Sequence, residues 1–220
     1  SHLQIVSRVV NSKNSLPILD NVLFNIEDGI LKITASDLES TITTTLSLDN
    51  YNGNGIIAIE TKKMIDILKE FSEQPLTFNI DTESNRIDIV SQNGRYTLVG
   101  VKGNDFPQPT QIHEDKSISI SISPEILYTG ISSAIFATGD DELRPIMNGI
   151  FIELQNSGIN FVATDAHKLV KYTRHEVKAE TESSFILPKK PANILKSILP
   201  KISDDVMLQF DDKNAVFTIG

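Results

Sequence analysis

Residues 16–24 (LPILDNVLF) and residues 144–152 (RPIMNGIFI) are diverged copies of one segment, separated by 128 positions. The same offset carries residues 35–37 (ASD) onto residues 163–165 (ATD). A register kept over so long a span indicates an internal repeat, and a repeat determines architecture before local detail does. We therefore expect two similar folding units in this chain, one nearly complete and one represented by most of its length.

The composition of the chain is typical of a globular protein with two domains of ordinary size. Its 220 residues are 40% hydrophobic and 22% charged, which suffices for two cores. No apolar run is long enough to cross a bilayer, and nothing resembles a cleavable export signal. Cysteine is absent, which excludes disulfides and thiol chemistry, and we expect a cytoplasmic location without membrane association.

The net charge of −9, from 20 basic and 29 acidic residues, argues against a protein that coats nucleic acid generally. A sum over the whole chain does not locate the cations, however. A minority of lysines gathered on one face can still create a local positive field. The acidic balance therefore limits the extent of a nucleic-acid surface without excluding one.

Apolar periodicity predicts an α+β architecture in which helices and antiparallel hairpins alternate, with sheets on one side and helices on the other. The expected helices cover residues 1–11, residues 61–71, the segment that Ser123 caps and Pro124 opens, and residues 188–199. The expected strands cover residues 22–26, 30–35, 41–48, 77–81, 86–91, 95–101, 117–123, 149–154, 159–163, 168–175, 206–210 and 215–220. The helix residues expected to face inward are Leu3, Val6, Val9, Val10, Met64, Ile67, Leu68, Phe71, Ile126, Leu127, Ile131, Ala134, Ile135, Ile194, Leu195, Ile198 and Leu199.

A proline-punctuated linker at residues 105–109 (DFPQP) separates the two copies. We expect one domain at residues 1–113 and a second at residues 114–220. The second copy begins with a strand that has no counterpart in the first copy, and it stops where the equivalent of strand 95–101 should begin. We therefore interpret the chain as a fragment that lacks the opening strand of its first domain and the C-terminal end of its second.

No catalytic or cofactor-binding motif is present in the sequence. Glycine-rich nucleotide loops and the signatures of zinc proteases and serine hydrolases are absent, and the four histidines show no metal-ligand spacing. Residues 164–168 (TDAHK) do place a carboxylate near an imidazole, as an acid–base pair requires. Asp165 and its repeat-mate Asp37 can equally be turn residues that accept backbone N–H bonds after a strand, which is the interpretation we favour.

Paired lysines open the second helix of each copy, as Lys62-Lys63 in the first and Lys189-Lys190 in the second. A solvated polar face is the usual explanation for one such helix. Two repeat-related pairs would instead form a strip able to meet phosphates if the units pack side by side. Base-specific readout is not expected, because no Arg, Asn or Gln cluster occupies a plausible recognition helix.

Four motifs in one register resemble the bacterial DNA sliding clamp family, the β subunit of DNA polymerase III. They are residues 16–19 (LPIL), 35–39 (ASDLE), 104–107 (NDFP) and 162–169 (VATDAHKL). The resemblance implies the DNA-clamp fold, in which two subunits of three similar domains form a ring with sheets outside and helices around a central hole. This chain would supply domain I and most of domain II, and domain III would be absent.

The resemblance also implies a function that is topological rather than catalytic. The clamp is the processivity factor of the replicative polymerase, and it encircles duplex DNA without sequence specificity and tethers its partners through a peptide-binding groove. It would be a non-catalytic subunit, without cofactors, of a DNA-directed DNA polymerase holoenzyme. The implied partners are double-stranded DNA, the α subunit of DNA polymerase III, the clamp loader, other proteins with clamp-binding motifs and a second copy of the full-length protein.

Candidate site residues follow from this resemblance together with the lysine pattern. The DNA-binding candidates are Lys13, Lys62, Lys63, Lys189 and Lys190. The peptide-groove candidates are Met147, Thr164, Ala166, His167, Lys168 and Leu169, with apolar anchors expected at Met147 and Leu169 and a polar rim at His167 and Lys168. The subunit-interface candidates are Tyr96 and Leu98. The loop before Arg144 departs from the family pattern at Asp141 and at Pro145-Ile146, so DNA contacts by this loop are not carried over.

Two other classes of function stay open on the sequence. A hydrolase built on Asp165 and His167 would need a nucleophile or a metal cluster from other segments, and none is found. A repeated scaffold that binds only protein would not need lysine pairs on corresponding helices.

Overall fold

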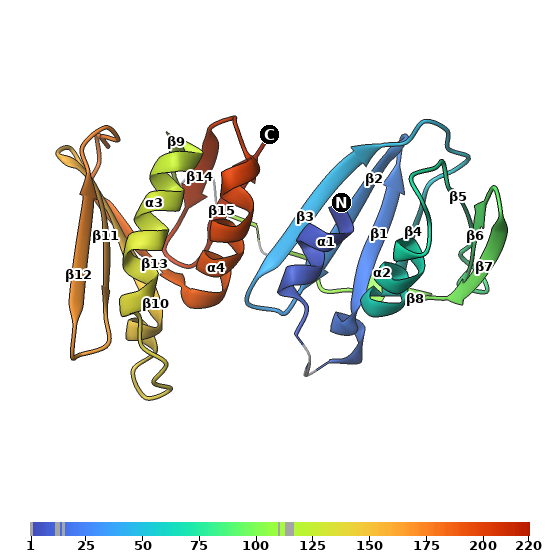
Figure 1. Cartoon of the computed structure of the whole chain (residues 1–220), viewed down its shortest axis with the longest axis horizontal. Helices are drawn as coiled ribbons and strands as arrows, with labels where there is room; N and C mark the ends of the chain where they lie inside the picture. Colours follow the sequence, from blue (N-terminus) through green and yellow to red (C-terminus); the bar gives the residue numbers. More distant parts are fainter. Residues whose placement is uncertain (1, 12–13, 15, 110, 113–116) are drawn as a thin grey trace. The chain divides into compact units, whose positions relative to one another are not determined.

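A computed structural model describes residues 2–11, 14, 16–109, 111–112 and 117–220 of the chain (Figure 1). The chain folds into two compact units, unit 1 at Ser1–Pro109 and unit 2 at Thr110–Gly220. The predicted domain boundary at residue 113 lies outside the described residues. Among the residues described, no helix is both long and apolar enough to cross a membrane.

Unit 1 combines short helices with an antiparallel sheet of order β3-β2-β1-β4-β8 and a second sheet of order β5-β6-β7. Its elements are α1 (His2–Val6), η1 (Ser7–Val9), η2 (Pro17–Asp20), β1 (Asn21–Glu27), β2 (Ile30–Ser36), β3 (Thr41–Ser47), β4 (Gly55–Glu60), α2 (Thr61–Lys69), β5 (Thr77–Asp81), β6 (Arg86–Ser91), β7 (Gly94–Val99), β8 (Val101–Lys102) and η3 (Gly103–Asp105).

Unit 2 has a sheet of order β12-β11-β10-β13 and a second sheet of order β15-β14-β9. Its elements are β9 (Ile118–Ile122), α3 (Pro124–Ala134), η5 (Ile135–Ala137), η6 (Pro145–Asn148), β10 (Gly149–Gln155), β11 (Gly158–Thr164), β12 (Leu169–Arg174), β13 (Ser183–Pro188), α4 (Lys189–Ile198), η7 (Leu199–Lys201), β14 (Val206–Phe210) and β15 (Ala215–Ile219).

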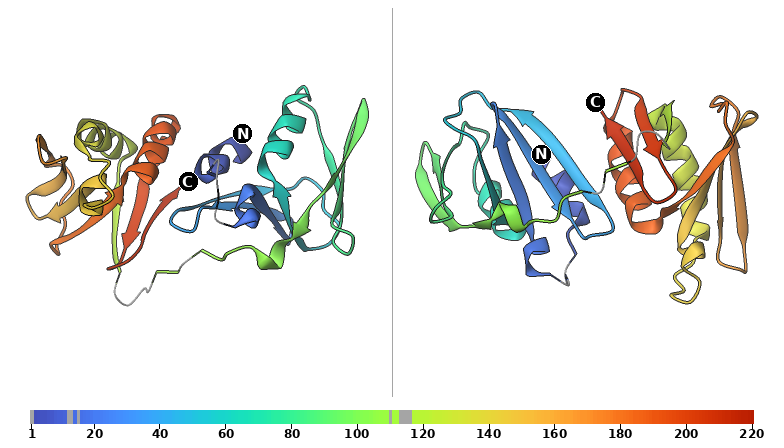
Figure 2. Two further views of the ribbon diagram at one scale, coloured as in Figure 1. Left: turned by 90° about the horizontal axis from the view of Figure 1, so that it is seen from below. Right: turned by 180° about the vertical axis from the view of Figure 1, so that it is seen from behind.

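The repeat predicted from the sequence is confirmed by the topology of the two units. The order β3-β2-β1-β4 in unit 1 matches β12-β11-β10-β13 in unit 2, and every strand pair is antiparallel. The first hairpin of unit 1 turns at Asp28 and Gly29, with φ of 50° and 79°. Two consecutive left-handed residues match the right-handed twist of the strands they join. In each unit the helices lie on one face of the sheets (Figure 2).

Helix α3 shows how sequence and packing agree in unit 2. The Ser123 side chain accepts a hydrogen bond from the backbone N–H of Ile126, and Pro124 occupies the first helical turn, as predicted. The five apolar positions predicted to face inward on this helix are all buried. Gly130 lets the helix approach β11 closely, because a Cβ built there would lie 2.3 Å from the Phe161 ring.

Several predictions about local structure were wrong. Strands β4 and β13 were missed, although the apolar runs of both are visible in the sequence. The predicted strand 95–101 is broken at Gly100, where an added Cβ would lie 2.7 Å from the carbonyl oxygen of Ala58. Phe106 in the predicted linker is instead buried in the core of unit 1 beside Leu23 and Ala58.

The inward faces of the lysine-bearing helices are narrower than predicted. Met64 of α2 is fully buried, whereas Ile67, Leu68 and Phe71 are half-buried. In α4 and the turn after it, Leu195 and Leu199 are buried, whereas Ile194 and Ile198 are half-buried. Each helix therefore rests on the sheet by a narrow stripe, and a large part of its circumference stays near solvent.

Replacing Gly130 by Ala should destabilise the protein, although alanine is normally the better helix former. The new methyl group would overlap the Phe161 ring, and the helix would have to move off the sheet. We expect the free energy of unfolding, measured by urea denaturation, to fall by about 1–3 kcal/mol.

The matched control for this prediction is Ser133→Ala on the same helix. Ser133 is half-buried, and alanine is a better helix former than serine as well, so without the clash stability should hold or rise slightly. Equal stability for the Gly130 variant and the wild type would show that α3 does not need this close approach.

Candidate nucleic-acid interface and peptide groove

Helices α2 and α4 each present a lysine pair in the first turn, where a strand runs directly into the helix. Lys62 and Lys63 follow β4 and are exposed, while Lys189 and Lys190 follow β13 and are half-buried. Both helices are described throughout, and neither carries an acidic residue in its first turn. Cations at the positive end of a helix dipole are unfavourable, so these positions do not serve the stability of the helices.

Some of these cations are paired with carboxylates of their own unit. The Lys63 ammonium lies 2.5 Å from a carboxylate oxygen of Glu60, the residue that precedes α2. The Lys189 ammonium donates to both oxygens of Asp140, at 2.7 and 2.8 Å. The fifth DNA-binding candidate, Lys13, lies outside the described residues.

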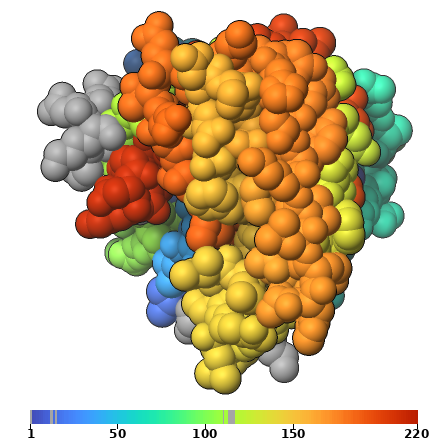
Figure 3. Space-filling view, turned by 90° about the vertical axis from the view of Figure 1, so that its left-hand side faces the viewer, coloured from blue at the N-terminus to red at the C-terminus, as the bar shows by residue number. Residues whose placement is uncertain are grey.

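The segment 139–148 forms a tied loop that stands out at one end of unit 2 (yellow in Figures 1 and 3). Its base is closed by the backbone N–H of Gly139, which donates to the carbonyl of Met147 at 2.7 Å. The amide of Asn148 bridges the loop, accepting from the N–H of Asp141 and donating to its carbonyl, both at 3.0 Å. At the tip, the Leu143 side chain is 91% exposed.

Within this loop Asp141 is bound to Arg144. The Arg144 guanidinium donates to the Asp141 carboxylate at 2.8 Å, and the N–H of Leu143 donates to the same carboxylate. The Arg144 hydrogen bond is the main reason why the pKa of Asp141 lies below its usual range, and the Leu143 bond adds to it. The charge of Arg144 is therefore partly neutralised inside the loop.

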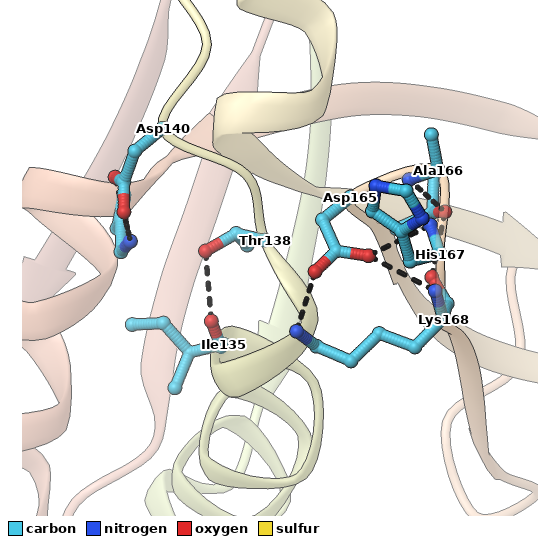
Figure 4. A network of polar contacts seen from close by, with 9 residues as sticks. Ile135, Thr138, Asp140, Asp165, Ala166, His167 and Lys168 are labelled. Carbon is cyan, nitrogen blue, oxygen red and sulfur yellow. Dashed lines mark hydrogen bonds and ion pairs between the residues drawn. The ribbon is translucent and has the colours of Figure 1, made fainter.

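The turn between β11 and β12 gathers most of the peptide-groove candidates (Figure 4). The carboxylate of Asp165 accepts from the N–H groups of His167 and Lys168 at 3.0 and 2.9 Å, and the Lys168 ammonium approaches it to 2.5 Å. Ala166, at the tip of the turn, has φ of 75°. The Thr164 hydroxyl accepts from the N–H of Ala166 and donates to the carbonyl of Lys168.

The repeat-equivalent turn in unit 1 is built in the same way. Asp37 accepts from the N–H groups of Glu39 and Ser40, and Leu38 has φ of 78°. The structural interpretation of Asp165 and Asp37 as turn residues is therefore confirmed. Unit 1 makes this turn without a histidine, so the acid–base constellation is not what the backbone requires.

Asp165 is poorly suited to act as a general base. The hydrogen bond from the Lys168 side chain, followed by those from the N–H groups of Lys168 and His167, holds the pKa of this carboxyl far below its usual value. Lys168 is exposed and its ammonium is bound to Asp165, and its place in the polar rim of the groove stays a prediction. His167 is exposed at the rim of the turn.

The apolar peptide-groove candidates differ in exposure. Leu169, the first residue of β12, is 68% exposed, which is unusual for a leucine at the start of a sheet strand. Met147 lies in η6 and is half-buried. Both belong to unit 2, and the turn that carries Leu169 is held rigid by the hydrogen bonds of Asp165 and Thr164.

Arg174 ties the far end of β12 to helix α3. Its guanidinium donates to the Thr129 hydroxyl at 3.0 Å and pairs with Glu125 of the helix and with Glu176. The hydrogen bond with Glu176 is the main reason why the pKa of Arg174 lies above its ordinary value, and hydrogen bonds with Tyr172 and Glu125 add to it. The strand that begins at Leu169 is therefore fixed to the helix layer, a role for Arg174 that the sequence did not reveal.

The subunit-interface candidates lie on β7, the outer strand of the β5-β6-β7 sheet. Tyr96 is 40% exposed and its ring meets Phe71 edge-on, with centroids 5.3 Å apart. Leu98 is half-buried, and it pairs in register with Ile87. Among the described residues no strand pairs with the outer edge of β7, so its backbone groups are available to a partner.

Two family models match the chain in sequence. The model for the N-terminal domain of the DNA polymerase III beta subunit matches residues 1–110, and the model for the central domain matches residues 121–220. Similar curated proteins are the beta sliding clamp of Haemophilus influenzae, 28% identical over 223 residues, and that of Pseudomonas aeruginosa, 28% identical over 219 residues. These alignments cover 98% and 99% of this chain but 60% and 59% of those proteins.

Solved structures give the same result for the fold. The DNA polymerase III subunit beta of Pseudomonas aeruginosa superposes with a TM-score of 0.90 at 27% identity, covering 100% of this chain and 59% of that one. A putative DNA polymerase III beta subunit from Eubacterium rectale gives a TM-score of 0.91 at 23% identity, again with 100% and 59% coverage. The chain spans about three-fifths of the length of these proteins.

Replacing Asp165 by Ala should weaken the β11–β12 turn in a manner that depends on pH. The pKa of Asp165 is lower in the folded protein than its ordinary value of 3.8, so its stabilising contribution is present above that value. The contribution is lost as the pH falls toward the lower folded pKa. We expect the urea midpoint of the variant to lie below that of the wild type at about pH 7, and the gap to narrow by about pH 3.

Asp212→Ala is the control for this experiment, because Asp212 is exposed and no hydrogen bond or ion pair of its side chain is found among the described residues. Its midpoint should follow the wild type at both pH values. A gap for Asp165→Ala that does not change with pH would mean that the carboxylate charge contributes nothing to the turn.

Proposed function

Since the chain belongs to the family of the DNA polymerase III beta subunit, we propose that it forms part of a sliding clamp, a non-catalytic processivity factor that encircles duplex DNA. The clamp would act in the cytoplasm and hold the replicative polymerase on its template without reading base sequence. The complete clamp would be a ring of two copies of a longer protein. The present chain would supply its N-terminal and central domains.

The observation that carries this proposal is the repeated lysine pair at the start of α2 and α4. Residues that break a local rule without a structural benefit are expected at functional sites, and cations at a helix N-terminus break the rule for helix dipoles. A helix N-terminus also presents unpaired N–H groups to an anion. Lysine ammoniums and N–H groups together suit phosphates, which carry no base information.

A sliding tether must hold the DNA backbone weakly and release it easily. Lysine provides a mobile point charge rather than a rigid bidentate fork, so it suits transient contacts with passing phosphates. The net charge of −9 is compatible with this role, because a lysine pair at the start of one helix can create a local positive field in a chain that is acidic as a whole.

We assign the turn 164–169 and Met147 to a groove for partner peptides. Exposed Leu169 and half-buried Met147 supply apolar anchor points, and His167 supplies a polar rim. The partners would be the α subunit of DNA polymerase III, the clamp loader and other proteins that carry a clamp-binding motif. The rigid Asp165 turn supports this assignment, because a preformed groove costs less ordering on binding.

The contact between two copies of the longer protein would use the outer edge of β7. Tyr96 and Leu98 supply apolar surface there, and the unpaired backbone of the strand can extend a sheet across the interface. A hydrolytic function has no comparable support, since the Asp165 carboxylate is fully engaged in its turn.

Reversing the charge of the α4 lysine pair tests the DNA-binding part of the proposal. We expect Lys189→Glu with Lys190→Glu to weaken binding of this chain to a short labelled duplex by roughly tenfold at low salt. The slope of log K against log salt should become shallower by between about one and two, because Lys190 loses a phosphate contact and Lys189, which is paired with Asp140, loses a weaker one. Fluorescence anisotropy with duplexes of unrelated sequence should give the same loss for each.

The matched control is Lys178→Glu with Lys213→Glu, which changes the net charge equally at exposed sites outside α4. These substitutions should weaken binding much less, because they act only through the overall field. Equal losses for both double variants would show that α4 makes no specific contact with DNA.

Substituting Leu169 by Asp tests the peptide groove. In the longer protein with its C-terminal domain, the variant should bind a polymerase-derived clamp-binding peptide at least tenfold more weakly, because a charge replaces an apolar anchor that the bound peptide would cover. Calorimetric titration of the peptide provides the measurement. Binding of duplex DNA and the solution mass should stay as in the wild type, and an unchanged peptide affinity would contradict the assignment of Leu169.

A further inference from the structure

The Lys189–Asp140 ion pair joins the proposed DNA-facing helix to the tied loop. Both oxygens of Asp140 accept from the Lys189 ammonium, although the two residues are 49 positions apart in sequence. The Asp140 side chain is 80% exposed and that of Lys189 is 36% exposed. The pair therefore lies at the surface of unit 2, where another anion can approach the ammonium.

Asp140 is held in place by the residues on either side of it. The N–H of Gly139 bonds to the carbonyl of Met147, and the N–H of Asp141 bonds to the Asn148 side chain. A carboxylate fixed on such a loop loses little further conformational freedom when it pairs, so it is a stronger competitor than a mobile side chain. Lys189 thus faces a preplaced anion within its own unit.

The same loop neutralises a second cation. The Nε of Arg144 lies 2.8 Å from a carboxylate oxygen of Asp141. The consecutive carboxylates of Asp140 and Asp141 therefore each bind one basic side chain of unit 2. In unit 1, Glu60 binds Lys63 immediately before α2. One candidate phosphate contact in each unit, Lys63 in unit 1 and Lys189 in unit 2, is therefore bound to a carboxylate.

Such a pair changes the energetics of a phosphate contact without blocking it. A DNA phosphate that reaches Lys189 exchanges one ion pair for another, so the contact gains less free energy than it would with an unpaired ammonium. Exposed ion pairs are weak, and the exchange is therefore easy. Weak, readily exchanged contacts favour movement along DNA over tight holding.

We propose that Asp140 is an intramolecular competitor of DNA phosphate for Lys189 and thereby sets how weakly unit 2 holds duplex DNA. The inference rests on the proposed function and adds to it a carboxylate that regulates the same surface. In a purely structural role, by contrast, Asp140 would only brace the loop against α4, and its removal would affect stability but not DNA binding.

Asp140→Asn separates these roles, because it removes the charge and keeps the size of the side chain. We expect the variant chain to bind a labelled duplex roughly twofold to fivefold more tightly than the wild type at about 50 mM salt. The slope of log K against log salt should become steeper by up to about one, reflecting one more counterion released. Asp140→Lys should bind more tightly still.

Asp212→Asn and Asp212→Lys are the matched controls, since they change net charge equally at an exposed carboxylate outside the loop. Urea denaturation of each variant verifies that it is folded. The inference is overturned if the Asp140 variants gain no more affinity than the Asp212 variants, or if they bind more weakly than the wild type.

Combining Asp140→Asn with Lys189→Glu and Lys190→Glu distinguishes this inference from the proposed function. In that background Asp140→Asn should no longer increase the affinity for DNA, because the Lys189 ammonium for which Asp140 competes is absent. If the lysine reversals weaken DNA binding but Asp140→Asn alone gives no gain over its control, only the inference about Asp140 fails. If the lysine reversals also leave DNA binding unchanged, the DNA-facing role of α4 fails as well.

Discussion

In both units, the packing of one apolar helix stripe onto an antiparallel sheet determines where the polar residues of that helix can lie. Met64 anchors α2 and Leu195 anchors α4, and both are buried. A helix fixed on one side must present the opposite side to solvent, so its lysines have a set direction relative to the sheet. The strands β4 and β13 lead directly into these helices, which places each lysine pair at the same point of the repeat. The proposed DNA surface therefore depends on ordinary core packing.

The lysine pairs at the N-termini of α2 and α4 are electrostatically unfavourable for the helices that carry them. Lysines at a positive helix end are unfavourable, and in the structure nearby carboxylates compensate for some of them, as Asp140 does for Lys189 and Glu60 for Lys63. One arrangement thus serves two requirements. The carboxylates offset the repulsion between these lysines and the positive end of the helix dipole when no ligand is bound. Each lysine could still exchange its carboxylate partner for a phosphate. A surface of this kind would attract DNA without holding it firmly, as the proposed function requires.

The β11–β12 turn shows how residues that look catalytic can be structural. Asp165 and His167 are close in sequence, but Asp165 directs its oxygens at backbone N–H groups and at Lys168. Asp37 makes the same turn in unit 1 next to Leu38 and Glu39. The internal repeat separates the two interpretations of Asp165. Both copies form this turn but only one has a histidine, so the turn cannot depend on the histidine. The same rigid turn then leaves Leu169 exposed.

The sequence by itself determined the repeat, the α+β class, most strands, the capped start of α3 and the turn role of Asp165. These follow from local periodicity and turn chemistry, which act over a few residues. It missed β4 and β13, because short apolar runs do not distinguish a buried strand from other buried segments. It also treated Phe106 as linker, whereas the core of unit 1 buries it.

Only the tertiary structure brought Asp140 to Lys189, across 49 positions, and Arg174 to Glu125 across the same separation. Such contacts depend on how loops and helices meet in three dimensions. The pattern of neighbouring residues does not show which residues 49 positions apart in the sequence come together.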